Sequence, residues 1–333
     1  MVNFKTAIYR LNKTLSAIDY NQLPISDYNK QYIGRIKPAL PYYLEIFATC
    51  IKEAQKRQSK KLSELTMVDF GGGSGFLSML AKQLGMGQVV YVDLNEESVK
   101  TISLLKELTG TGPDVILHGS AGTLRAWCEE TGTKPELLVA TDLIEHIYNL
   151  NTFFSELRDV NEAMHMVFTT ASTPYNPMVI RRLHKLMKVC EQGENGYRSV
   201  REKYIKNSFP RLTPNEVSEW ATQTRGLVFA DIEKAIKANQ PPRLSDPYNT
   251  CNPATGNWAE RILPIKEYRS LLSAQGYSLA VLKGFYNTRQ TNPLKAVVCK
   301  ILNTAIRGTG SLGFVAAPFI LLSCRGKGSN PSL

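Results

Sequence analysis

The stretch VDFGGGSGF, at residues 68–76, leads from a short apolar segment into a helical one through four glycines. Glycine tolerates positive φ and lets a ligand approach the backbone closely, so this concentration of glycine favours a binding turn over a purely structural one. The helix that follows presents free backbone N–H groups in its first turn. The stretch therefore predicts a strand, a ligand-binding turn and a helix in direct succession.

The spacing of the glycines separates two ligand classes that bind such turns, dinucleotides and S-adenosylmethionine. A dinucleotide fingerprint requires G-x-G-x-x-G. Counted from Gly71 the third position is Phe76, and counted from Gly73 it is Ser78, so neither register fits. The spacing present is D-x-G-x-G-x-G, formed by Asp69, Gly71, Gly73 and Gly75.

An alternation of apolar strands and short helices extends outward from this turn. We expect strands at 66–70, 88–92, 114–117, 136–140 and 165–170, with helices between them at 76–84, 96–108, 123–130 and 144–160. Strands separated by helices imply parallel crossovers and a doubly wound α/β sheet. Such sheets bind ligands beyond the carboxyl ends of their strands, where the motifs of this chain lie.

The alternation stops after residue 172 and resumes near residue 265. The part between is helical and loop-rich, and we interpret it as an insertion that covers the active-site end of the sheet as a lid. A helix at 265–275, a strand at 277–284, a helix at 294–307 and a last strand at 314–323 complete the pattern. The expected organisation is an N-terminal helical cap (1–65), a core (66–172), the insertion (173–264), closing elements (265–325) and a tail (326–333).

Asp93 ends the second expected strand. A carboxylate at this position can accept hydrogen bonds from both ribose hydroxyls of a nucleoside cofactor. Alternatively, Asp93 caps the helix that starts near Glu96. Together with the glycine turn, the position favours the ribose role, which both cofactor classes share.

The glycine turn and Asp93 resemble the first two motifs of class I S-adenosylmethionine-dependent methyltransferases. The resemblance covers about residues 66–172 and the two closing strands. It implies a Rossmann-like, doubly wound, seven-stranded sheet whose last strand is antiparallel, with S-adenosyl-L-methionine as cofactor. It places Asp69 near the amino acid part of the cofactor, with the glycines beneath it and Asp93 and Leu94 at the ribose.

Two further segments bear on this resemblance. After the third strand, where the family often has an acid or amide at the adenine, this chain has Ser120 and Ala121, and a hydroxyl can still make one such bond. After the fourth strand, TDLIEHI at 141–147 resembles the D-x-x-E-H segment of small-molecule methyltransferases of the ubiquinone-biosynthesis type. This likeness implies that Asp142 lies at the methyl end of the cofactor and that Glu145 and His146 line the active site.

His146 is the best candidate for the base that a hydroxyl nucleophile needs, because a neutral imidazole can take up a proton at pH 7. Asp142 or Glu145 would orient it, whereas an ordinary histidine at a helix start is the alternative. His165 and His184 are weaker candidates, since one opens a strand and the other lies among basic residues. Substrate contacts are expected from four aromatic residues, for each of which core packing explains the sequence equally well: Tyr175, Trp258, Tyr28 and Tyr32.

The formal net charge of +11 is concentrated in two segments. Residues 176–211 hold nine Lys/Arg and three acids, and residues 283–333 hold seven Lys/Arg and no acid. Solvated surfaces are the simplest explanation; otherwise the segments suit an anionic or lipid-linked small molecule. We disfavour a nucleic acid partner, because the N/D-P-P-Y/F segment of amino-directed nucleic-acid methyltransferases is absent after the fourth strand.

The helix expected at 294–307 is apolar with Lys295, Lys300 and Arg307. We favour packing on the sheet as the crossover between the last two strands; the alternative is peripheral contact with a membrane. The apolar run at 313–323 is too short to cross a bilayer, and the N-terminus lacks the apolar stretch of a signal peptide. Six scattered cysteines without C-x-x-C spacing or a histidine cluster argue against a disulfide framework and a metal site, and favour a reducing cytoplasm.

Together these observations predict an enzyme that moves the methyl group of S-adenosylmethionine to oxygen, nitrogen or carbon of a small molecule. An RNA methyltransferase, an NAD(P)-dependent oxidoreductase on a similar sheet and a non-catalytic S-adenosylmethionine-binding module are the alternatives.

Overall fold

The computed structural model describes residues 3–56 and 58–326, so all of the expected tail except Gly326 lies outside the described residues. Its centre is one seven-stranded sheet with strand order β3-β2-β1-β4-β5-β7-β6. The strand bounds are β1 Thr66–Phe70, β2 Gln88–Asp93, β3 Val115–His118, β4 Leu137–Thr141, β5 His165–Thr170, β6 Tyr277–Lys283 and β7 Ile320–Gly326. β7 pairs antiparallel with both β5 and β6, whereas the pairs among β1–β5 are parallel. This arrangement confirms the expected fold class.

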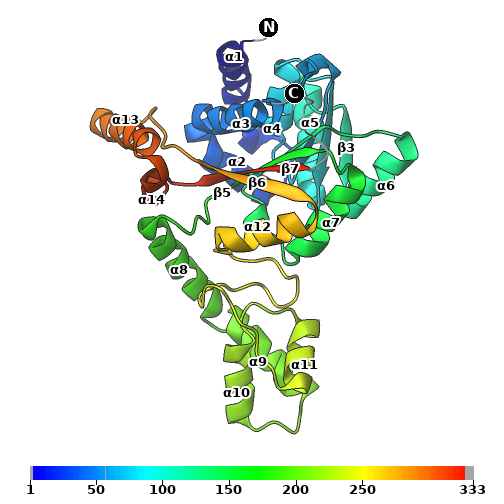
Figure 1. Ribbon diagram of the computed structural model, residues 1–333, viewed down its shortest axis with the longest axis vertical. Coiled ribbons are helices and arrows are strands. Elements are labelled where there is room, and N and C mark those ends of the chain that lie inside the picture. The colour runs from blue at the N-terminus through cyan, green and yellow to red at the C-terminus, as the bar shows by residue number, and fades with distance from the viewer. Residues whose placement is uncertain (1–2, 57, 327–333) are drawn as a thin grey trace.

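Helices cover both faces of the sheet (Figure 1). One face carries α1 Phe4–Ser16, α2 Asp27–Ile36, α3 Leu40–Gln55, α4 Phe76–Gln83 and α5 Glu96–Thr109, and the other carries α6 Ala121–Thr131, α7 Leu150–Val160 and α12 Ile265–Ala274. Neighbouring strand residues point to opposite faces, so Met67 joins the first core and Val68 the second. The strands are buried on both sides, which explains their nearly continuous apolar sequence.

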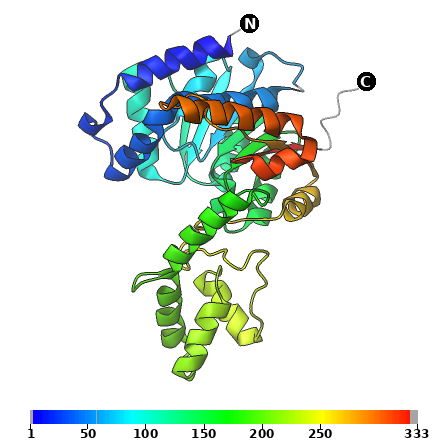
Figure 2. The same ribbon diagram turned by 90° about the vertical axis from the view of Figure 1, so that its left-hand side faces the viewer.

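The insertion contains α8 Pro177–Glu191, α9 Tyr197–Ser208, α10 Pro214–Gln223 and α11 Phe229–Ala238. Figures 1 and 2 show α8 leading away from the sheet, with α9–α11 as a separate lobe at its far end. This lobe has its own small apolar core around Ile205, Val217 and Ile232. The lobe projects away from the sheet in this arrangement, so a function as a lid stays a prediction. The expected segment boundaries also stay predictions.

Two expected elements are corrected. The helix expected at 144–160 is a 3₁₀ turn, η4 Ile144–His146, followed by α7 from Leu150, because Asn149 caps α7 by accepting the amide N–H of Thr152. The last strand begins at Ile320 rather than at residue 314, and α14 Gly313–Ala316 precedes it. Pro318 lacks an N–H for strand pairing, and a short apolar run does not by itself distinguish strand from helix.

The helix expected at 294–307 is α13, Pro293–Gly308, but it does not pack its apolar side on the sheet. Only Asn303 and Ile306 are buried, while Leu294 is 76% and Ile301 is 63% exposed. The favoured expectation of a packed crossover is therefore wrong for this face. The remaining 3₁₀ turns are η1 Tyr20–Gln22, η2 Lys37–Ala39, η3 Leu62–Glu64 and η5 Gly310–Leu312. Within the described ranges, no helix combines the length and apolarity that a bilayer crossing requires.

A buried ion pair stabilises the insertion lobe and gives a test of its independence. Arg201 is fully buried, donates from Nε to the Ala221 carbonyl at 2.7 Å, and binds both carboxylate oxygens of Glu191 at 3.1 and 2.7 Å. We expect Arg201→Met to destabilise α9–α11 locally by about 3–5 kcal/mol, because Glu191 loses its main partner. Hydrogen exchange should show faster exchange in these helices and unchanged protection in β1–β5. The matched control is Arg198→Met, an exposed residue of the same helix paired with Glu202, which should change stability by less than about 1 kcal/mol; equal effects of the two variants would contradict the assignment.

Candidate functional site

The glycine turn between β1 and α4 adopts a backbone that requires glycine. Gly73 has φ +52° and Gly75, the N-cap of α4, has φ +72°. Gly72 has an ordinary φ, but a Cβ there would lie 2.5 Å from the ring of Tyr91. The turn thus brings the main chain close to β2 without any side chain of its own in the way.

Asp69 lies beneath this turn and is almost completely buried. Its Oδ2 accepts hydrogen bonds from the amide N–H of Ser78 at 2.9 Å and from the Ser78 hydroxyl at 2.7 Å. Burial raises the pKa of Asp69 to about 7, while the hydrogen bonds from Ser78 oppose the rise. Asp69 therefore joins the end of β1 to the first turn of α4, and its predicted contact with a cofactor is untested.

Asp93, at the end of β2, binds the turn directly. Its Oδ2 accepts the amide N–H of Gly73 at 2.9 Å, and its Oδ1 accepts the amide N–H of Asn95 at 2.8 Å. The hydroxyl of Tyr91 donates to the Gly73 carbonyl at 2.7 Å. The capping role weighed for Asp93 falls to Asn95, whose side chain accepts the amide N–H of Glu97 at the start of α5.

The residues predicted at the ribose and the adenine lie next to Asp93 in space. Leu94 is 72% exposed, and its carbonyl accepts a hydrogen bond from His118 Nε2 at 3.0 Å. Ser120 is the N-cap of α6 and accepts the amide N–H of Gly122 through its hydroxyl oxygen, while Ala121 is buried. The ends of β2 and β3 thus form one edge that carries an exposed apolar side chain and an exposed hydroxyl.

Tyr32 of α2 lies over the glycine turn. A Cβ at Gly73 would contact the ring and the hydroxyl of Tyr32 at 3.4 Å, and Tyr28 stacks on Tyr32 with a centroid distance of 6.4 Å. Burial raises the pKa of Tyr32 above its ordinary range, and the charge of Asp142 adds to the rise. The N-terminal segment therefore contributes Tyr32 to the space between the turn and Asp142, while Tyr28 stays largely exposed.

Asp142 follows β4 in a left-handed conformation, with φ +50°. A residue other than glycine rarely adopts this conformation, which is often found at functional sites. Burial among surrounding groups, with a smaller contribution from the charge of Glu260, raises the pKa of Asp142 to about 6. Asp142 nevertheless keeps solvent-accessible surface in this position.

Glu145 and His146 lie in the 3₁₀ turn that follows. Glu145 is buried, and burial followed by the charge of Asp142 raises the pKa of its carboxyl well above the ordinary value. Its Oε2 has no hydrogen-bond partner among the described residues. The structure therefore gathers the three residues predicted for catalysis around one turn.

His146 is oriented by the chain that returns from the insertion. Its ring Nδ1 lies 2.8 Å from the carbonyl oxygen of Trp258, which can only accept, so Nδ1 carries the proton. The backbone N–H of Trp258 donates to the His146 carbonyl at 3.2 Å, and that of Arg261 donates to the Glu145 carbonyl at 3.1 Å. In the neutral ring, Nε2 then holds the free lone pair.

The indole of Trp258 is itself buried. It stacks on Tyr148 with a centroid distance of 6.1 Å, and the guanidinium of Arg261 lies 4.6 Å from its ring centroid. The ring of Trp258 is thus packed between Tyr148 and Arg261, and its contact with a substrate stays a prediction.

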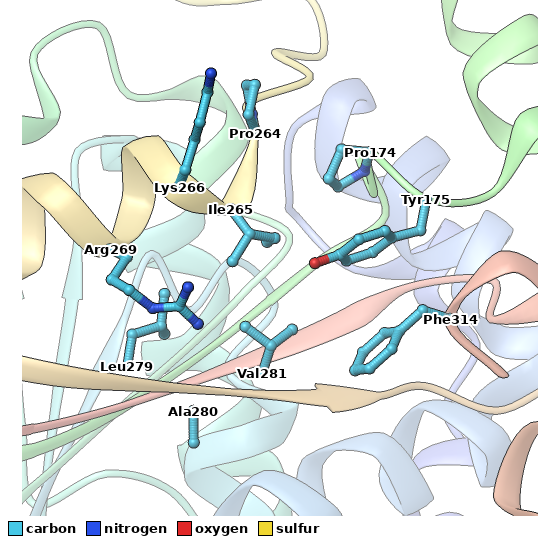
Figure 3. Close-up of a pocket in the computed structure, with 10 residues that line it drawn as sticks. All are labelled: Pro174, Tyr175, Pro264, Ile265, Lys266, Arg269, Leu279, Ala280, Val281 and Phe314. Carbon is cyan, nitrogen blue, oxygen red and sulfur yellow. The ribbon is translucent and has the colours of Figure 1, made fainter. Parts of the chain in front are cut away.

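Tyr175 lines a cavity of about 560 Å³ beside β6 (Figure 3). Figure 3 shows its hydroxyl and the guanidinium of Arg269 pointing toward the middle of this cavity, while Lys266 extends away at the rim. The ring of Tyr175 packs against Phe314 with a centroid distance of 5.1 Å. The predicted substrate aromatics are thus divided, because Tyr32 lies at the glycine turn and Tyr175 lies in this separate cavity.

Glu260 was not predicted from the sequence. It accepts the Ser172 hydroxyl at 2.6 Å, and its charge acts on both Asp142 and Glu145. No local motif marks this residue, because it reaches the site from the end of the insertion.

His165 and His184 lie elsewhere, as expected: His165 binds the Ala54 carbonyl and Ser323, and His184 pairs with Asp246. No group of three or more metal-ligating side chains occurs in the part of the chain that the structure describes.

No family model matches the chain, and neither does any curated protein. Among solved structures, it is similar to a SAM-dependent methyltransferase from Agrobacterium tumefaciens, with 16% identity and a TM-score of 0.31 over 39% of this chain and 44% of the other. It is also similar to PKMT2 from Rickettsia typhi, with 11% identity and a TM-score of 0.45 over 86% and 53% of the two chains. A third is magnesium protoporphyrin IX methyltransferase from Synechocystis, with 12% identity and a TM-score of 0.38 over 98% and 89%. The chain spans about half the length of the first two, and with TM-scores this low the fold rests on the strand order of the chain itself.

The raised pKa of Asp69 gives a pH-dependent stability that can be measured. The folded state holds this proton up to about pH 7, whereas the unfolded state releases it near pH 4. The contribution of Asp69 to stability is therefore complete below pH 4 and is lost as the pH rises through 7. In urea denaturation, we expect the stability of the wild type relative to Asp69→Asn to fall by about 2–3 kcal/mol between pH 5 and 8, at about 1.4 kcal/mol per pKa unit. Asparagine keeps an oxygen for Ser78, so parallel pH profiles of the two proteins would refute the assigned shift.

Proposed function

We propose that this protein is a class I S-adenosylmethionine-dependent methyltransferase that acts on a small-molecule acceptor. The observation that carries the proposal is the turn at 71–75, where left-handed glycines at the end of β1 meet the carboxylate of Asp93 at the end of β2. The sheet supports it, because β7 runs antiparallel between β5 and β6. A classic dinucleotide-binding sheet continues with parallel strands in the order 4-5-6.

The edge formed by β2 and β3 fits an adenosine. Each carboxylate oxygen of Asp93 accepts one backbone N–H and keeps a further lone pair for a ribose hydroxyl. The exposed side chain of Leu94 offers an apolar surface to a purine ring, and the Ser120 hydroxyl can still donate its own proton. Ala121, Gly71 and Gly75 would complete the cradle as small residues.

The other end of the cradle is acidic. Asp142 and the more deeply buried Asp69 lie where the cationic amino group of the cofactor would be favoured. When bound, the cofactor supplies a methyl group that its sulfonium already activates, so the protein mainly has to align a nucleophile. Tyr32, above Gly73, would limit access of water to this end.

His146 is the proposed base. With its Nδ1 proton donated to the Trp258 carbonyl, Nε2 is free to accept the proton of an acceptor hydroxyl as the new bond to the methyl carbon forms. The neighbouring carboxylates of Asp142 and Glu260 would stabilise the imidazolium that results. Glu145 is buried, and burial raises the pKa of its carboxyl, so it would shape the wall of the site rather than act as the base.

We further propose that the acceptor is anionic or lipid-linked. The cavity of Tyr175 is lined by two cations, Lys266 and Arg269, and residues 283–333 carry no acid. Cations that line a cavity favour negatively charged ligands. The acceptor atom is not specified by these residues.

Cofactor binding is the first test. In titration calorimetry we expect S-adenosylhomocysteine to bind with micromolar affinity and NAD(P) not to bind. Asp93→Ala should weaken binding of S-adenosylhomocysteine by about 10–100-fold, because two ribose hydroxyls lose a charged acceptor. The control Glu96→Ala removes an exposed acid three residues away and should leave the affinity unchanged. Tight binding of NAD(P) without S-adenosylhomocysteine would refute the proposal.

The role of His146 is the second test. Using S-adenosylmethionine labelled in its methyl group and a mixture of small-molecule and lipid extracts, we expect label transfer by the wild type. His146→Gln should reduce the rate by about 10²–10⁴-fold, as is typical of a lost general base, with unchanged affinity for S-adenosylhomocysteine. His184→Gln, whose ring pairs with Asp246 on the insertion, is the matched control and should retain the rate. Full activity of His146→Gln would exclude the assigned base.

A further inference from the structure

Helix α13 presents an apolar stripe to solvent. Leu294, Val297, Val298 and Ile301 recur at helical spacing, and all four are more than half exposed. Figure 1 shows α13 at the margin of the molecule, beyond the edge of the sheet. Two more exposed apolar residues, Leu312 and Val315, follow directly in η5 and α14. Exposed apolar side chains grouped in this way mark an interaction surface.

The opposite side of α13 is firmly attached to the protein, so the stripe is held in place. The side chain of Asn303 accepts the amide N–H of Tyr286 at 2.7 Å and donates to its carbonyl at 2.9 Å. Lys283 donates to the carbonyls of Ile306 and Gly310 at the end of the helix, at 2.5 and 3.0 Å. These bonds fix the rotation of the helix, which leaves the apolar stripe directed outward.

Cations flank the stripe. Lys295 follows Leu294 by one position and Lys300 precedes Ile301 by one, which places them on opposite sides of the stripe at 100° per residue. Both are exposed, as is Arg307 in the last turn, and none of the three forms an ion pair within the described ranges. The nearby acid Glu45 is engaged by Arg289. The whole segment from Lys283 onward has no acidic residue.

We propose that α13 binds the surface of a bilayer that contains anionic lipids, with its apolar stripe among the acyl chains and its lysines at the headgroups. An outward apolar stripe flanked by cations is the arrangement of interfacial helices. A second copy of this chain would bring a like-charged helix against α13, which opposes dimerisation through this face. Anionic headgroups supply the missing complementary charge.

The helix also lies near the site. The hydroxyl of Tyr42 in α3 donates to the carbonyl of Phe285 in the loop leading to α13, at 2.7 Å. Because α3 also packs against β4, which leads into Asp142, membrane binding through α13 would turn this side of the candidate site toward the bilayer, where lipid-linked acceptors are found; this consequence alone rests on the proposed function.

Vesicle flotation of the full chain tests the proposal without any cofactor. The wild type should bind vesicles containing phosphatidylglycerol at least about tenfold more strongly than pure phosphatidylcholine vesicles, and high salt should reduce the difference. The double variant Val298→Gln/Ile301→Gln should lose at least about tenfold in binding. Lys295→Gln/Lys300→Gln should lose the preference for anionic vesicles.

The matched control is Met178→Gln/Val189→Gln, which removes two exposed apolar side chains from α8 and should bind vesicles like the wild type. Thermal unfolding and binding of S-adenosylhomocysteine should be unchanged in the α13 variants, which separates this proposal from the proposed function. Equal vesicle binding by wild type and Val298→Gln/Ile301→Gln would overturn it. The proposal would also be overturned if the wild type bound no vesicles and formed a dimer in sedimentation velocity, and if this variant were a monomer.

Discussion

Both backbone polar groups of Gly73 are held by side chains of the neighbouring strand. Its N–H donates to Asp93 and its carbonyl accepts the hydroxyl of Tyr91, so β2 determines the path of the turn that follows β1. The same Tyr91 ring occupies the space that a Cβ at Gly72 would need. The turn is thus shaped across two strands, and its open backbone depends on their parallel pairing, from Thr66 with Gln88 to Phe70 with Val92. These bonds form without a ligand, and a turn held in this way would lower the entropic cost of binding the proposed cofactor.

The core strands are predictable from sequence because each is short, apolar and bounded by turn residues. β1 and β5 have the bounds expected, and the glycine spacing identifies the turn between β1 and α4. Prediction of an element fails where its apolar pattern fits two structures, such as a strand and a helix, or a buried face and an exposed one. Residues 314–322 contain no polar side chain, and only Pro318 marks the start of pairing at Ile320. For α13 the periodicity identifies an apolar stripe, but whether a sheet or solvent faces that stripe depends on distant contacts such as Asn303 with Tyr286.

The candidate site divides in the same way. Asp93, Leu94 and Ser120 follow strand ends, so their grouping at one edge of the sheet follows from strand order alone. Asp142, Glu145 and His146 are close in sequence and remain close in space. Glu260 and the carbonyl of Trp258 belong to the end of the insertion, and no local sequence pattern predicts that they contact the site. The backbone carbonyl of Trp258 therefore determines which ring nitrogen of His146 carries the proton, whereas the sequence suggested only a substrate contact for the Trp258 side chain.

This division assigns different tasks to different parts of the chain. The residues proposed for the cofactor lie in the core and the N-terminal segment, and none of them comes from the insertion. The groups around His146 depend on the returning segment, whose backbone pairs with Glu145 and His146 and whose Glu260 reaches Ser172. Tyr148 connects the lobe at α9–α11 to this segment, because its hydroxyl donates to Asp231 of α11 at 2.7 Å and its ring stacks on Trp258. A rearrangement of the lobe would be transmitted to the site through these contacts. Under the proposed function, the position of the insertion would therefore affect proton transfer through His146 more than cofactor binding, because its returning segment orients the imidazole.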